Sequence, residues 1–160
     1  MEKILYFIKR NKTVFAWVVV TLFAGGLAAI LSGSFDIYET YNKPPLAPSA
    51  ILFPIVWTLL YVLMGISAGR VAVSNDLDKG KALKIYILQL GVNIIWPVIF
   101  FRLEAFKFAC IWLALLIILV FATYKGFKSI DKTASWLLLP YVAWLLYAFY
   151  LNLGFVALNS

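Results

Sequence analysis

The sequence contains no histidine, a single cysteine and only seven acidic residues among 160. Histidine, cysteine and carboxylate side chains are the usual metal ligands and acid–base catalysts of proteins. The lone Cys110 cannot form an internal disulfide, and the acidic residues fall in predicted loops and tails. These absences exclude a metal cluster, a catalytic triad and a proton relay built from paired carboxylates. We therefore expect no metal site and no required cofactor.

Charged residues are also scarce: they make up 13% of the chain, whereas 64% of the residues are hydrophobic and 18% aromatic. A helix that crosses a bilayer needs about 20 predominantly apolar residues. Five uncharged windows of that order occur, and they are too long and too continuously apolar for the strands of a barrel. The sequence predicts one all-α domain, residues 1–160, forming an integral membrane bundle of five transmembrane helices. These are expected at about residues 13–33, 49–72, 84–101, 107–124 and 134–158.

The net charge of +7 is distributed unevenly between the predicted loops. Most basic residues fall in the amino-terminal segment, the second loop and the fourth loop, which lie on one side of a five-helix bundle. Only Lys43, Arg102 and Lys107 fall on the other side. The positive-inside rule then predicts a cytoplasmic N-terminus and a C-terminus outside. Insertion into a lipid bilayer explains the basic excess, so we expect no nucleic acid partner, and the small chain without a eukaryotic tail favours a bacterial plasma membrane.

The first predicted loop, residues 34–48, is longer than the other connections and contains three prolines. Long ordered loops of compact domains are often binding loops, and proline fixes the backbone φ angle. The segment Lys43, Pro44, Pro45 and Leu46 is therefore predicted to act as a lid. A solvated connector is the alternative.

Aromatic and amide side chains follow one face of three predicted helices, at helical spacings of three and four. On the second predicted helix these are Phe53, Trp57 and Tyr61; on the third, Gln89, Asn93, Trp96 and Phe100; on the fifth, Tyr141, Trp144, Ala148 and Asn152. Buried amide and indole groups need partners in hydrocarbon, so the three faces are predicted to line one intramembrane ligand pocket. Alternatively, the amides join helices and the tryptophans form an interfacial belt.

Prolines and small residues lie within the same helices. Pro54, Pro97 and Pro140 predict kinks near the pocket, because proline removes a backbone donor. Gly65-x-x-x-Gly69 and Gly25-x-x-x-Ala29 permit close helix packing, within the bundle or between protomers.

Three stretches resemble the TspO/translocator protein family, also called tryptophan-rich sensory proteins or peripheral-type benzodiazepine receptors. They are Phe53-Pro-Ile-Val-Trp57 through Gly65, Gln89-x-x-x-Asn93-x-x-Trp96-Pro97, and Pro140-Tyr141-x-x-Trp144 with Leu151-Asn152. The resemblance implies a five-helix bundle, commonly dimeric, with a pocket beneath the first loop that binds tetrapyrroles such as protoporphyrin IX. It carries pocket roles to Trp57, Tyr61, Gln89, Asn93, Trp96, Trp144 and Ala148.

The resemblance has two departures. Many members have a tryptophan in the first loop where this chain has Leu46, so one aromatic wall of the pocket is missing. The sterol motif of animal members needs a basic residue late in the fifth helix, but none follows Lys132. Cholesterol recognition by that motif is therefore unsupported.

We therefore expect a membrane receptor or binding protein, commonly a homodimer in this family, for tetrapyrroles or similar planar hydrophobic molecules, with a regulatory or transport role. One alternative is light-dependent porphyrin degradation, with Trp57 and Trp144 as candidate catalytic residues. A second alternative is a structural or assembly partner that uses the Gly65/Gly69 face. The lack of acid–base groups favours binding over enzymatic activity.

Overall fold

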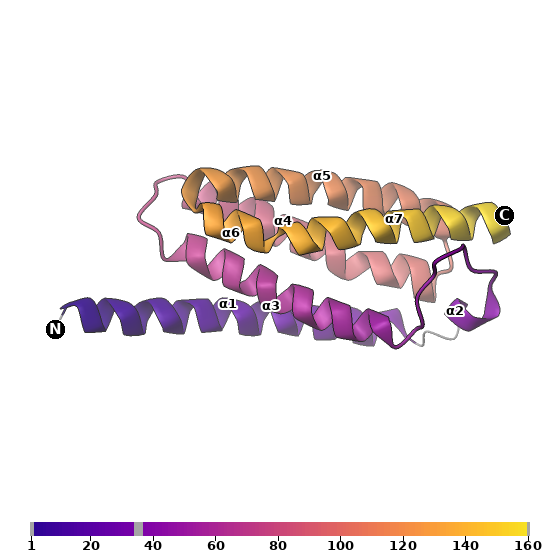
Figure 1. Cartoon of the computed structure of the whole chain (residues 1–160), viewed down its shortest axis with the longest axis horizontal. Helices are drawn as coiled ribbons and strands as arrows, with labels where there is room; N and C mark the ends of the chain where they lie inside the picture. Colours follow the sequence, from indigo (N-terminus) through magenta and orange to yellow (C-terminus); the bar gives the residue numbers. More distant parts are fainter. Residues whose placement is uncertain (1, 34–36, 160) are drawn as a thin grey trace.

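The computed structural model describes residues 2–33 and 37–159, which form helices and no β-strand (Figure 1). The helices are α1 (Glu2–Ser32), α2 (Ile37–Thr40), α3 (Leu52–Ala72), α4 (Lys79–Pro97), the π-helix η1 (Val98–Arg102), α5 (Phe106–Ile130), α6 (Lys132–Leu137) and α7 (Leu139–Asn159). Five spans are long and apolar enough to cross a membrane: Arg10–Ser32, Leu52–Ala72, Lys79–Arg102, Phe106–Ile130 and Lys132–Asn159. The predicted all-α, five-helix membrane bundle is confirmed.

Several helix boundaries differ from the prediction. Helix α4 begins at Lys79 rather than at residue 84, and α5 runs to Ile130 rather than to residue 124. Hydropathy detects only the apolar part of a helix, which lies in hydrocarbon. Lysine is a good helix former, so these helices continue beyond the apolar part through lysine residues. For the same reason α1 begins well before residue 13; it ends at Ser32, before Gly33 at a φ of 76°.

The second predicted helix starts too early, because residues 49–51 form a turn in which the Leu52 N–H donates to the Ser49 carbonyl at 3.0 Å. The predicted lid is also not a plain loop. It contains the short helix α2, and its residues 34–36 lie outside the described part of the chain.

Kinks were predicted at Pro54, Pro97 and Pro140, and the helices are irregular at two of these prolines, Pro97 and Pro140. Helix α4 ends at Pro97 and passes into η1, in which the Leu103 N–H donates to the Val98 carbonyl five residues earlier. The fifth span, predicted as one helix over 134–158, is divided at Leu138 into α6 and α7, and Pro140 lies in the first turn of α7. Pro54 causes no break, because it lies in the first turn of α3, where backbone N–H groups have no intrahelical partner.

Helix α3 runs obliquely across the bundle: it lies beside α6 at one end and crosses over α1 towards the lid (Figure 1). Gly65 and Gly69 face α1, and a Cβ on either glycine would meet the backbone of Val18 or Val14 at 2.5 and 2.6 Å. The predicted small-residue pattern therefore packs within one chain. Because α1 occupies the Gly65/Gly69 face, this face is not available to an assembly partner.

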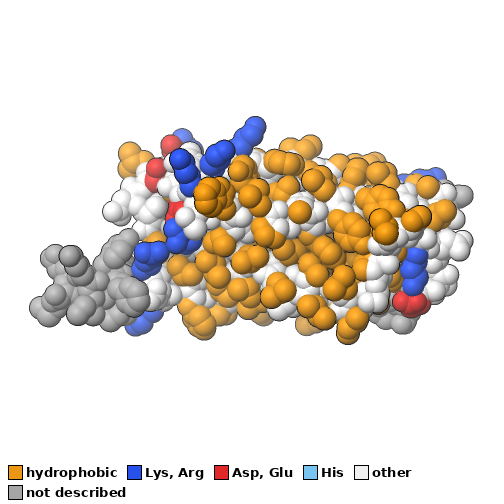
Figure 2. Space-filling view, viewed as in Figure 1, with side chains coloured by type: hydrophobic (Ala, Val, Ile, Leu, Met, Phe, Trp, Pro, Cys, Tyr) orange, Lys and Arg blue, Asp and Glu red, His pale blue; other side chains and the backbone are white. Residues whose placement is uncertain are grey.

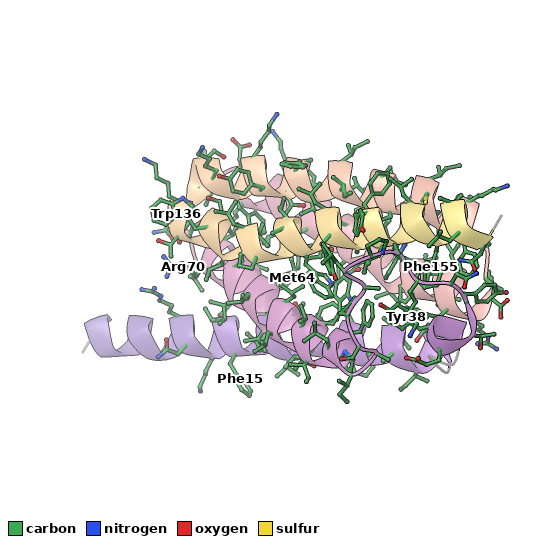
Figure 3. All side chains as sticks on the ribbon, turned by 45° about the vertical axis from the view of Figure 1, so that its right-hand side comes forward. Phe15, Tyr38, Met64, Arg70, Trp136 and Phe155 are labelled. Atoms are coloured by element: carbon green, nitrogen blue, oxygen red, sulfur yellow. The ribbon has the colours of Figure 1, made fainter. Side chains whose placement is uncertain are left out.

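At the opposite end from the lid, α6 is fixed to α3 by polar contacts. Arg70 pairs with Asp131 at 2.8 Å, and Asp131 also accepts the Ala134 N–H at the start of α6. The Ser67 hydroxyl donates to the Ala134 carbonyl at 2.7 Å. Figure 3 shows Met64 and Phe155 within the bundle and Phe15 pointing outward.

Apolar side chains cover the middle of the molecule, and Lys and Arg gather at the end with the N-terminus and the α3–α4 connection (Figure 2). Large exposed hydrophobic residues occur on every long helix, including Phe15, Leu59, Ile111 and Leu153. Such a surface is stable in hydrocarbon and not in water. The chain is an integral membrane protein.

Candidate ligand-binding site

A cavity of about 100 Å³ lies between α1, α3 and the α4–η1 segment, in the half of the bundle nearer the lid. Its walls are Gly25, Ala28, Ala29 and Ser32 from α1; Phe53, Pro54, Trp57 and Tyr61 from α3; and Asn93, Trp96, Pro97 and Phe101 from α4 and η1. Five predicted pocket residues thus meet at one cavity.

The wall formed by α3 and α4 is aromatic. Trp57 lies 5.6 Å from Tyr61 and 6.5 Å from Trp96 between ring centroids. Phe53 meets Phe101 edge to face at 6.3 Å. Aromatic pairs prefer such tilted and edge-to-face arrangements, which hold the rings in fixed orientations. The cavity therefore presents indole and phenyl surfaces to a ligand.

Asn93 is the main polar group of this wall. Its Nδ2 donates to the Tyr61 hydroxyl at 3.3 Å, while its Oδ1 is buried and has no partner among the described residues. An unpaired buried acceptor costs about 1–3 kcal/mol, so Oδ1 is ready to accept a hydrogen bond from a ligand. Within residues 2–33 and 37–159, no three His, Cys, Asp or Glu side chains come together as metal ligands.

A second, smaller hollow of about 10 Å³ lies between α2, α3, the α4–η1 segment and α7. It contains the predicted residues Phe100, Ala148 and Asn152, and it shares Phe53, Trp96 and Phe101 with the larger cavity. These three rings therefore separate the two spaces. Asn152 fixes this partition, because its Oδ1 accepts the Trp96 indole N–H at 3.3 Å.

Gln89 and Tyr141 lie in the core beside the cavity and not on its wall. The Tyr141 hydroxyl donates to Gln89 Oε1 at 3.0 Å, and the Tyr141 ring lies 6.1 Å from Trp57. Gln89 Nε2 is buried and has no partner among the described residues. This hydrogen bond joins α4 to α7, as interhelical amide contacts do in membranes, and holds the Tyr141 ring against Trp57.

Trp144 lies on the side of α3 that faces α7, away from the cavity. It lines an open groove between α3 and α7, and the Phe53 ring lies 6.0 Å from the Trp144 ring, between the groove and the cavity. The structure therefore does not bring Trp144 to the cavity that contains Trp57.

The α1 wall was not among the predicted site residues. Gly25, Ala28, Ala29 and Ser32 repeat at spacings of three and four, so they form one small-residue face. The Tyr61 ring packs directly on Gly25, where a Cβ would collide with it. The Gly25-x-x-x-Ala29 pattern was the available signal, although it was interpreted only as a packing motif.

The predicted lid residues fold over the lid end of α7. The Tyr150 hydroxyl donates to the Pro45 carbonyl at 2.7 Å and the Tyr147 hydroxyl to the Leu46 carbonyl at 2.6 Å. Leu46 adopts a φ of 63°, which is uncommon for a residue with a side chain, and its side chain is 85% exposed. None of residues 43–46 lines the cavity, so Leu46 forms no part of its walls.

Tyr38, from α2, holds the end of the same segment. Its hydroxyl donates to the Pro48 carbonyl at 2.8 Å, and the Lys43 ammonium lies 4.8 Å from its ring centroid. Burial raises the pKa of Tyr38 to about 12, with smaller contributions from Tyr147 and Glu39. The hydroxyl therefore remains protonated, and able to donate, at neutral pH.

The chain forms a five-helix membrane bundle with an aromatic cavity, an arrangement that fits a membrane receptor or binding protein. Comparison with known proteins shows the family of the chain. The TspO/MBR family model matches residues 14–158, and the chain belongs to this family. The resemblance noted in the sequence is thereby confirmed.

Named relatives occur in bacteria and in yeast. Protein CrtK of Rhodobacter capsulatus is 38% identical over 152 residues, which cover 92% of this chain and 93% of CrtK. Tryptophan-rich protein TspO of Chlorobaculum tepidum is 34% identical over 126 residues, covering 76% of this chain and 78% of the relative. The translocator protein homolog of Schizosaccharomyces pombe is 39% identical over 128 residues, covering 76% and 77%.

Proposed function

We propose that this receptor binds a tetrapyrrole, or a similar planar hydrophobic molecule, in the cavity between α1, α3 and α4. The observation that carries the proposal is the combination of flat aromatic walls with one unpaired buried acceptor, Asn93 Oδ1. A planar ring system stacks on Trp57 and Trp96, and its polar edge bonds to Asn93. A regulatory or transport role for tetrapyrroles follows from such binding.

Binding on this scale requires the cavity to expand. Its volume of about 100 Å³ is below the roughly 300–1,000 Å³ of typical small-molecule sites. Rotation of Phe53 would join the cavity to the hollow beneath α2, since this ring borders both.

The experiment is a thermal unfolding screen of the purified protein with protoporphyrin IX, cholesterol and an isoquinoline drug. A ligand that binds only the folded state at 100 times its Kd stabilises that state by about 2.7 kcal/mol. Protoporphyrin IX is expected to give the largest rise in unfolding temperature. A rise with cholesterol or the isoquinoline drug and none with protoporphyrin IX would refute the proposed ligand class.

Light-dependent degradation of porphyrin is a second candidate function. It is supported by the contact of Trp57 with Tyr61, Trp96 and Tyr141, which provides a continuous group of oxidisable rings beside the cavity. An excited porphyrin would exchange an electron with Trp57 and then be oxidised by dioxygen, with the protein supplying orientation. Illumination of the complex should bleach the porphyrin absorbance faster than in detergent alone, and Trp57→Phe should remove the difference.

Orientation and oligomeric state also belong to this proposal. The basic end of the molecule supports a cytoplasmic N-terminus and an outer lid, in a bacterial plasma membrane (Figure 2). A homodimer is part of the same proposal because the family is commonly dimeric; exposed apolar residues occur on every long helix and do not mark one dimer face. Labelling of single cysteines in intact cells and the mass of the solubilised protein test these two points.

A further inference from the structure

The cavity between α1, α3 and the α4–η1 segment is not closed off from the surface of the bundle. Most of its lining residues are buried, but Ala29 of α1 and Pro54 of α3 are exposed. Gly25 and Trp57, which lie about one helical turn deeper on the same two helices, are partly exposed. These four residues mark an opening of the cavity between α1 and α3, here called the α1–α3 mouth.

The α1–α3 mouth faces the hydrocarbon of the bilayer. On the α1 side, Phe23 and Ile30 are 74% and 79% exposed, and on the α3 side Ile55 is 53% exposed. Large apolar side chains exposed in this way are stable in lipid and not in water. Ala29 lies near the end of α1 and Pro54 lies in the first turn of α3, so the mouth belongs to the leaflet on the lid side.

The path from the lid to the cavity is blocked by buried rings. Tyr38 packs on Phe53 and on Phe155 with ring centroids 5.1 and 5.6 Å apart, and Phe100 lies 5.2 Å from Phe155 (Figure 3). All four rings are at most 5% exposed. Because protein interiors are closely packed, a ligand on this path would have to separate several rings at once.

The α1–α3 mouth presents smaller obstacles. Its α1 side consists of Gly25 and Ala29, and a Cβ added to the neighbouring Gly26 would meet no atom within 4 Å. On the α3 side the large side chain is Trp57, whose ring lies 5.6 Å from Tyr61 between centroids. Partly exposed side chains change rotamer far faster than packed elements separate. Movement of one indole ring would therefore widen the mouth.

We infer that the ligand enters the cavity sideways from the leaflet on the lid side, through the α1–α3 mouth, and displaces Trp57 as it passes. This inference rests on the proposed function, and it identifies the ligand as a molecule dissolved in the bilayer. A planar hydrophobic molecule leaves water for hydrocarbon, so it is concentrated where the mouth opens. The lid segment then closes the site on the side of the water.

The experiment measures how fast protoporphyrin IX binds to and leaves the full chain in phosphatidylcholine vesicles, from the quenching of tryptophan fluorescence. Ala29→Phe places a ring at the mouth and should lower both the association and the dissociation rate constants about 10-fold, which corresponds to about 1.4 kcal/mol of added barrier. A variant that only damages the site would release the ligand faster.

Ala16→Phe is the matched control, because Ala16 is exposed on the same helix and does not line the cavity. It should leave both rate constants at their wild-type values. Faster release of the porphyrin from Ala29→Phe than from wild type, or equal rates in the two variants, would overturn the inference.

A cross-linked lid tests the other route. The Asn42 N–H donates to Asn159 Oδ1 at 3.0 Å, and Asn159 Nδ2 donates to the Asn42 carbonyl at 3.0 Å, so these positions join the lid to the end of α7. In a Cys110→Ser background, Asn42→Cys and Asn159→Cys are joined by a short bifunctional thiol reagent. The cross-link should leave both rate constants at the values of the unlinked double variant, and slower binding after cross-linking would show entry beneath the lid.

A measurement without porphyrin separates this inference from the proposed function. In vesicles of phosphatidylcholine brominated on its acyl chains, bromine quenches the tryptophans that contact lipid. Trp57→Phe should lower the quenched fraction of the fluorescence, whereas Trp96→Phe, which removes a buried tryptophan, should raise it. Failure of protoporphyrin IX to bind would refute the proposed function alone, and a quenched fraction that does not fall in Trp57→Phe would refute the mouth.

Discussion

The two faces of α3 are packed in opposite ways. Towards α1 the backbones approach so closely that Gly65 and Gly69 leave no room for a Cβ, whereas towards α7 a groove of about 500 Å³ remains open. The glycines let α3 lean onto α1, and the same inclination separates it from α7. One small-residue pattern therefore determines both the aromatic cavity on one side of α3 and the more open groove on the other.

The two faces of α3 also differ in the kinds of side chain that line them. The cavity contains indole, phenol and amide groups that bond to one another across helices, as in the Asn93–Tyr61 pair. The groove is lined mainly by aliphatic side chains, together with the rings of Trp144 and Tyr147. Trp57 and Trp144 thus lie on different sides of α3.

The largest expected effect comes from a substitution that obstructs the close contact between α3 and α1. Gly65→Ala forces a shift of the Val18 backbone, and overpacking of this kind costs about 1–3 kcal/mol. Gly91→Ala is the control, since no atom lies within 4 Å of its added Cβ, and it should stabilise α4 by about 0.5–1 kcal/mol. Unfolding in a denaturing detergent titration measures both. If Gly65→Ala unfolds at the wild-type midpoint, the close packing is not what positions α3.

Filling one face of α3 at a time distinguishes the cavity from the groove. Ala28 is buried on the α1 wall, so Ala28→Phe should occupy the cavity and weaken protoporphyrin IX binding at least tenfold, which is about 1.4 kcal/mol. Ala143→Phe adds the same side chain to the groove and should leave this affinity unchanged. The measurement is an absorbance titration of protein that remains folded by circular dichroism. Equal losses in the two variants would show that the ligand depends on the groove.

Substitution of one tryptophan on each face should give a smaller difference in protoporphyrin affinity. Trp57→Phe removes part of the stacking surface and should lower protoporphyrin affinity by about 2- to 10-fold, because an aromatic pair contributes roughly 0.5–1.5 kcal/mol. Trp144→Phe should change the affinity less than twofold, since Phe53 separates it from the cavity. Quenching of tryptophan fluorescence by the porphyrin reports both, and the reverse ranking would place the ligand beside α7.

The smallest effect concerns the segment that closes the lid end of both faces. The Tyr38 hydroxyl donates to Pro48, and burial raises its pKa to about 12, above the ordinary value of 10.0. A raised pKa means that this stabilisation is complete below pH 10 and is lost as the pH rises through 12. The difference in unfolding free energy between wild type and Tyr38→Phe, about 0.5 kcal/mol at pH 8, should therefore fall over that interval and change sign, because Tyr38 ionises more readily in the unfolded state than in the folded state. A difference that is constant from pH 8 to 12 would contradict the role of this hydroxyl.

The fold could be predicted because membrane insertion depends mainly on local composition. Five apolar windows identified the five spans, and helical spacing placed Trp57, Asn93 and Trp96 on faces that do meet at one cavity. The ends of the helices could not be predicted in the same way. Helix α5 continues through Lys125 and Lys128 because its backbone bonds persist beyond the apolar window.

The separation of the cavity from the groove could not be predicted from helical spacing, because it depends on how the helices pack against one another. Trp144 follows Tyr141 by three residues, a rotation of about 60° from the same face, and this is enough to place it on the other side of Phe53. No individual residue of the α1 wall was predicted, because Gly25, Ala28 and Ala29 have no reactive groups. Their role is to leave space, which becomes visible only when α1 packs on α3.

The most direct test of the central claim is an experimental structure of the chain with protoporphyrin IX bound. We predict ligand density between α1, α3 and α4, in contact with Trp57 and Trp96, with Phe53 rotated from its present position. Ligand density in the α3–α7 groove against Trp144, with the cavity between α1, α3 and α4 still closed, would contradict the account.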